Sequence, residues 1–142
     1  MINYFIKKWD KNKDKLENYF RTHNQEEYSS YEAIFKNIIK YVFNDEEYLY
    51  KKFNYEEVTV IDYGDYQGTQ ILVFCKDTYQ PDLSETYYTH VYYGSCSGCD
   101  TLLAIMNYDW DKKPTDEQVK DYMTLALHMV QHIKRFEEDD YE

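Results

Sequence analysis

The sequence has few of the residues that break or crosslink a chain: two prolines, four glycines and three cysteines among 142 residues. No apolar run reaches the ~18 residues that span a bilayer. Charges interrupt the opening stretch MINYFIKKWDKNK early, which argues against a secretory signal peptide. Three cysteines cannot close a disulfide framework, which favours a reducing compartment. We therefore expect a single cytoplasmic domain over residues 1–142, with no membrane association and no cofactor.

Positive charge is also scarce, because 16 Lys and Arg stand against 27 Asp and Glu, giving a formal net charge of -11. Such a surface repels nucleic acid and anionic membranes, and it attracts basic partners. Solubility alone is the simpler explanation of an acidic surface. Tyrosine is abundant, with 18 copies. Tyrosine suits protein interfaces, although a chain rich in Lys, Asn and Ile also has the composition of an AT-rich genome.

The apolar pattern changes twice along the chain and predicts an α+β fold. Helices are expected over about residues 2–45, with possible caps at Asp14 and at the capping box Ser29-x-x-Glu32. Strands are expected at 58–63, 70–75 and 87–93, within a region of about 57–94. Helices return over about 99–136, with a capping box at Thr115-x-x-Gln118, before a frayed acidic tail. Short connections predict a three-stranded antiparallel β-meander flanked by N-terminal and C-terminal α-helices.

The stretch GSCSGCD, residues 94–100, contains a Cys-x-x-Cys pair that is compatible with zinc, redox chemistry or a turn. In a meander, Cys75 would lie about seven residues along the strand from Cys96, roughly 23 Å away. We therefore expect Cys75 to be a small core residue. His128 and His132 have metal-binding spacing but lack a metalloprotease Glu. A turn is the most economical interpretation, with Ser97 or Asp100 capping the following helix.

All four glycines fall in two loops, 64–68 and 94–98, which the meander would bring together. Tight packing alone would explain this concentration. Alternatively the loops frame a binding site whose candidate residues are Asp62, Asp65, Tyr66, Gln67, Ser95, Cys96, Ser97 and Asp100.

Three segments of the sequence are similar to segments of a known protein family: DYGDYQGTQILVF, YYTHVYYGSCSGCDTLLAI and DYMTLALHMVQHIK. They resemble a family of small bacteriophage-encoded proteins that has no settled activity, and the similarity covers about Val58 to Lys134. The resemblance implies a viral accessory protein and assigns no catalytic residues. The segment up to Phe53 lies outside it.

The leading hypothesis is an inhibitor that binds a basic surface of a host defence or nucleic-acid-processing protein, as a nucleic-acid mimic and without binding nucleic acid directly. Acidic clusters could supply the charge and tyrosines the anchors: Glu26, Glu27, Asp45, Glu46, Glu47, Glu56, Glu57, Asp62 and Asp65, with Tyr48, Tyr50, Tyr55 and Tyr66.

Two other classes stay open. A small-ligand, nucleotide or zinc/thiol site would use the glycine loops, although neither loop contains Lys or Arg. A homo-oligomeric structural component would pair through an exposed edge strand at 87–93. No Ser-His-Asp order, phosphate-loop lysine or paired-acid motif indicates an enzyme.

Overall fold

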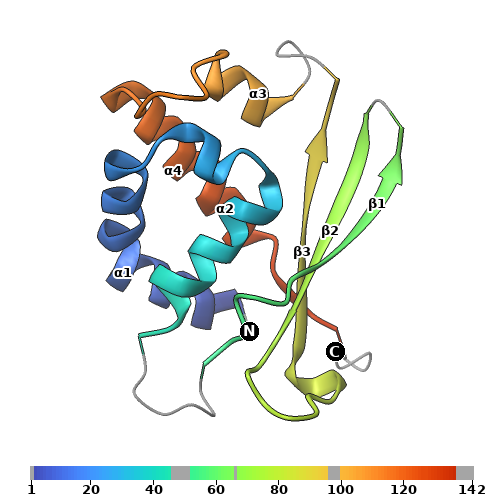
Figure 1. The fold of residues 1–142 in the computed structure, drawn as a ribbon. Helices are drawn as coiled ribbons and strands as arrows, with labels where there is room; N and C mark the ends of the chain where they lie inside the picture. Colours follow the sequence, from blue (N-terminus) through green and yellow to red (C-terminus); the bar gives the residue numbers. More distant parts are fainter. Residues whose placement is uncertain (1, 46–51, 66, 96–99, 137–142) are drawn as a thin grey trace.

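The computed structural model describes residues 2–45, 52–65, 67–95 and 100–136 (Figure 1). Its first half is helical: α1 (Ile2–Thr22), the 3-10 turn η1 (Gln25–Tyr28), α2 (Tyr31–Ile38) and the π turn η2 (Ile39–Phe43). The sheet follows, with β1 (Thr59–Gly64), β2 (Gly68–Cys75), the turn η4 (Leu83–Glu85) and β3 (Thr86–Tyr93). The chain then forms α3 (Thr101–Met106), α4 (Asp116–Gln131) and β4 (Lys134–Arg135). The α+β class and the antiparallel meander are confirmed.

The sheet has four antiparallel strands in the order β1-β2-β3-β4, one more than predicted. The C-terminal helix ends at Gln131 rather than near residue 136, and the chain turns back so that Lys134 pairs with Tyr88. The prediction that β3 is an exposed edge strand is therefore wrong for Tyr87 and Tyr88, the two residues that pair with β4. Among the described strands, β1 and β4 are the two edges, and β3 beyond Tyr88 pairs with β2 alone.

The helix starts follow the local capping chemistry. Thr115 and Gln118 form the predicted capping box of α4, and Asp100 caps α3 by accepting a hydrogen bond from the Leu103 amide. The cap of α2 is Ser30 rather than Ser29, because the Ser30 hydroxyl accepts from the Ala33 amide. Asp14 caps nothing, since it lies inside the single helix α1.

The helices cover one face of the sheet, here called the inner face (Figure 1). Phe74 of β2 is fully buried there and lies 5.0 to 6.2 Å, centroid to centroid, from the rings of Phe5, Phe35, Phe43, Phe53 and Tyr87. At the other end of α1, Phe20 stacks on Tyr122 of α4 at 5.2 Å. The Tyr122 hydroxyl donates to the buried Gln25 side chain, which joins α1, η1 and α4.

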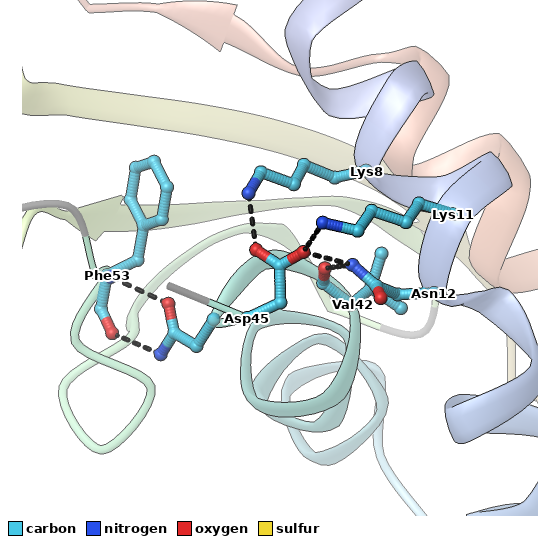
Figure 2. A network of polar contacts seen from close by, with 7 residues as sticks. Lys8, Lys11, Asn12, Val42, Asp45 and Phe53 are labelled. Carbon is cyan, nitrogen blue, oxygen red and sulfur yellow. Dashed lines mark hydrogen bonds and ion pairs between the residues drawn. The ribbon is translucent and has the colours of Figure 1, made fainter. Parts of the chain in front are cut away.

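A polar network fastens the end of η2 to α1 (Figure 2). The Asp45 carboxylate, whose side chain is 5% exposed, pairs with Lys8 and with Lys11 at 2.9 Å, and accepts from Asn12 at 3.0 Å. Burial alone would raise the pKa of Asp45, but the bonds from Lys8, Asn12 and Lys11 outweigh it and hold the pKa well below its usual range. The negative charge of Asp45 is thus balanced by Lys8 and Lys11 within the fold. The expectation that Asp45 belongs to an acidic binding cluster is therefore wrong.

The opposite face of the sheet, here called the outer face, is covered by no helix of the described chain (Figure 1). Strand register places on it Thr59, Ile61, Tyr63, Thr69, Ile71, Val73, Cys75, Thr86, Tyr88, His90, Tyr92 and Lys134. Ring contacts add His132, beside His90, and Phe136, beside Tyr88. Cys75 is therefore half-buried on the outer face, beside the Thr86 hydroxyl, and the expectation of a core position is wrong.

Candidate functional site

The two glycine loops lie side by side, as predicted. Gly64 pairs with Gly68 at the β1–β2 turn, and Gly68 pairs with Tyr93, which directly precedes Gly94. A Cβ on Gly64, whose φ is +147°, would lie 2.3 Å from the Gln67 carbonyl oxygen, and one on Gly68 would lie 2.0 Å from that of Tyr63. Only glycine fits these two positions, so packing of the turn explains them without a ligand.

Below the loops an open cleft of about 280 Å³ separates the inner face of the sheet from the first turns of α2 and α3. Its lining comes from both layers: Ser29, Ser30, Tyr31, Glu32, Val60, Gln70, Tyr93, Asp100, Leu102 and Leu103. The cleft is at the small end of the ~300–1,000 Å³ range of small-molecule pockets. It suits one inserted side chain better than a large ligand.

Asp100 forms the floor of the cleft. Its carboxylate is buried and accepts from the Tyr31 hydroxyl at 2.8 Å, the Gly94 amide at 2.8 Å and the Leu103 amide at 3.1 Å. Burial raises the pKa of Tyr31, so its hydroxyl stays protonated and donates to Asp100. Asp100 thus fixes the glycine loop to α3 and is a structural residue rather than a free ligand-binding group.

Asp62 lies beside the cleft and is exposed. Its carboxylate accepts from the Tyr93 hydroxyl and, at 3.4 Å, from the Gln70 amide. The hydrogen bond to Asp62 raises the pKa of Tyr93 to about 12. A carboxylate has about four acceptor sites, so Asp62 keeps capacity for a further donor.

The charge of the cleft is negative. Glu32 at its rim pairs with Lys36 at 3.0 Å, whereas no cation among the lining residues faces Asp62. The exposed Asp65 follows β1 at this end of the sheet, whereas Glu56 lines a separate pocket together with Lys40 and Lys52. A cationic side chain entering here would meet carboxylates and two tyrosines, a composition that favours Lys or Arg.

The structure brings together only some of the predicted site residues. Asp62 and Asp100 come together at the cleft, and Asp65, Gln67 and Ser95 are exposed in the loops above it. Tyr55 is half-buried elsewhere, with the Lys40 ammonium 5.4 Å from its ring centroid. The remaining candidates lie outside the described residues: Glu46, Glu47, Tyr48, Tyr50, Tyr66, Cys96 and Ser97.

Sequence reasoning missed four residues of the site: Tyr31, Glu32, Gln70 and Tyr93. The alternation of side chains between the two faces of a strand could have indicated two of them. Gln70 and Asp62 are register partners on the same face, and Tyr93 has the same parity as the buried Val91. Tyr31 and Glu32 follow Ser30 in the first turn of α2, and nothing local indicates that this turn packs against the sheet.

Among the described residues, no group of three or more His, Cys, Asp or Glu side chains is placed to hold a metal ion. His128 and His132 are both exposed, and His132 stacks on His90 with the ring centroids 4.6 Å apart. Burial, with His132 and Lys134 nearby, lowers the pKa of His90. His90 and His132 therefore form a stacked pair on the outer face rather than part of a chelating cluster.

Comparisons of the chain with protein-family models, with curated proteins and with solved structures found no match. No helix within the described parts of the chain is long and apolar enough to cross a bilayer.

Proposed function

We propose that the protein binds a basic surface of another protein, with a Lys or Arg side chain of that partner entering the cleft, and thereby blocks nucleic-acid binding by the partner. The observation that carries the proposal is the charge of the cleft: Asp62 lies beside it with no cation among the lining residues, and Asp65 follows β1 at the same end of the sheet. The resemblance to phage-encoded proteins makes a host defence or nucleic-acid-processing protein the expected partner.

Opposite charge on such a surface would speed encounter and would make binding sensitive to salt. The same charge disfavours the nucleotide alternative, because none of the residues lining the cleft is Lys, Arg or His. Phosphate groups would meet the Asp62 carboxylate, which no cation among the lining residues faces.

A pull-down from bacterial lysate tests the proposal. We expect the immobilised protein to retain a nucleic-acid-binding protein at about 50 mM salt and to lose it between there and about 200 mM. Added duplex DNA should displace the retained protein, since both would occupy the same basic surface. Retention that persists in excess DNA would contradict the proposed mimicry.

A matched pair of variants locates the binding surface. Asp62→Asn with Glu32→Gln removes two negative charges at the cleft, and Glu117→Gln with Asp121→Asn removes two exposed ones on α4. The cleft variant should bind at least about tenfold more weakly, whereas the α4 variant should stay within about threefold. Equal losses would show that net charge, rather than the cleft, attracts the partner.

A further inference from the structure

The outer face departs from the usual pattern of a sheet that has helices on one side only. Such a sheet alternates apolar residues toward the core with polar residues toward water. Here the water-facing positions include Ile61, Ile71 and Val73. The exposed fractions are 62% for Tyr63 and 69% for Tyr92. A continuous apolar and aromatic face of this kind marks an interaction surface.

The outer face also departs from the charge of the rest of the molecule. None of its side chains is Asp or Glu, although the chain holds 27 of these residues and has a net charge of -11. Its one fully charged residue is Lys134, and its two histidines are stacked. The acidic side chains of the described chain are thus missing from this face.

We propose that the outer face is the interface of a homodimer, in which two copies of this chain pack sheet against sheet. Face-to-face sheets pack ~10 Å apart with their side chains interdigitated, and a two-fold axis makes one apolar face self-complementary. This inference concerns the face opposite the cleft and does not rest on the proposed function.

Charge favours a second copy as the occupant. Two copies that met through their acidic surfaces would repel each other, whereas the outer face brings no carboxylates together. The two edges of the face are also complementary, because Glu56 and Glu57 precede β1 while Lys134 lies in β4. A two-fold axis parallel to the strands would lay β4 of one copy over β1 of the other.

The size of the face sets the expected strength of the dimer. Three strands of six to eight residues and the two-residue β4, spaced ~4.8 Å apart and rising ~3.3 Å per residue, project an area of roughly 400 Å². Two such faces give about 800 Å², which is in the range of weak, transient interfaces. We therefore expect a reversible dimer rather than an obligate one.

Sedimentation velocity over a range of concentrations, in reducing buffer, tests the inference. The wild-type chain should be dimeric at about 100 µM and largely monomeric near 1 µM. Tyr63→Lys with Tyr92→Lys places two charges on the outer face and should raise the dissociation constant at least about 100-fold. Tyr108→Lys is the control, since Tyr108 is 75% exposed and lies outside the face. It should dimerise like the wild type.

Circular dichroism and thermal melting establish that each variant is folded before its mass is compared. A wild-type chain that stays monomeric at 100 µM would overturn the inference and would leave the face to a different molecule. A dimer that survives the Tyr63→Lys and Tyr92→Lys changes would also overturn it. So would a dimer that forms only when the reductant is left out, because a disulfide would then be its cause.

Discussion

The two faces of the β-sheet differ more than any other pair of regions in this molecule, although they share the same strands. On the inner face Phe74 contacts five aromatic rings, and the buried Thr89 hydroxyl donates to the Met129 carbonyl at 2.6 Å. Val73, one residue from Phe74, and Ile71, three residues from it, point to the outer face and are half-buried. Alternation along one strand thus separates positions that stabilise the fold from positions available for binding.

The largest effect should come from truncating a side chain on the inner face of the sheet, and it is compared here with truncation of the adjacent side chain on the outer face. Phe74→Ala removes a ring from the aromatic cluster and should reduce the free energy of unfolding by about 3–5 kcal/mol. Val73→Ala, on the adjacent half-buried residue, should cost about 1 kcal/mol or less in the monomer. Urea denaturation at low protein concentration measures both. Similar losses for the two variants would mean that the outer face is also part of the folded core.

The second-largest effect on stability should come from the polar network that joins Asp45 to α1. Asp45→Asn replaces the carboxylate that pairs with the buried Lys8 by a neutral amide, and should reduce the free energy of unfolding by about 3 kcal/mol at pH 7. The lysine and asparagine partners depress the pKa of Asp45 in the folded state, so its contribution is complete above the unfolded value of about 3.9. The contribution is lost as the pH falls through the folded pKa.

Urea titrations between pH 7 and pH 3 therefore check the sign as well as the size. The wild type should lose more stability than Asp45→Asn over this range. Asp10→Asn, which changes an exposed residue of α1, serves as the control and should shift stability by less than about 0.5 kcal/mol. If the wild type and Asp45→Asn fell in parallel, the ion pair would contribute no stability.

A smaller effect is expected where the inner face meets the cleft. Tyr31→Phe removes the hydroxyl that donates to buried Asp100 and accepts from the Leu102 amide, and should cost about 1–2 kcal/mol. Thermal denaturation compared with Tyr108→Phe, an exposed tyrosine without this bond, isolates the contribution. An unchanged melting temperature for Tyr31→Phe would show that Asp100 does not depend on this donor.

The smallest effect concerns the outer face and appears only on acidification. Because burial and His132 lower the pKa of His90, the folded state resists its protonation. The associated stability is present above the unfolded value of about 6.5 and is lost as the pH falls through the folded pKa. His90→Gln should flatten the decline in melting temperature between about pH 7.5 and pH 5, whereas His128→Gln should leave it unchanged. Equal slopes for wild type and His90→Gln would refute the effect.

The sequence predicted which segments form helices and strands better than it predicted what packs against them. Period-two runs located β1 to β3, and the Thr115-x-x-Gln118 pattern located the start of α4, because these signals are local. β4 was missed because two residues carry no period. β2 has apolar residues on both faces, but periodicity does not reveal whether a second layer covers the outer one.

In the candidate site, too, local sequence patterns predicted some features, and the packing of distant segments determines the others. The pairing of the glycine loops follows from the meander, and it brought Asp62 and Asp100 to the same end of the sheet. The cleft itself depends on the placement of the first turn of α2 across from the sheet and against the start of α3, which brings together residues about 30 to 70 positions apart. The shift of the α2 cap by one residue, from Ser29 to Ser30, has a similar origin, because it buries Tyr31 over Asp100.

The contact between α1 and α4 has a consequence for the synthesis of the chain. Gln25 and Tyr122 are 97 residues apart, and Phe20 at the end of α1 packs on that same tyrosine. At ~5–20 residues per second, a ribosome needs roughly 5–20 s to make the intervening polypeptide. During that interval the apolar stripe of α1 has no α4 to cover it. Nascent chains stalled before residue 116 should therefore be the species that chaperones bind and that proteases remove.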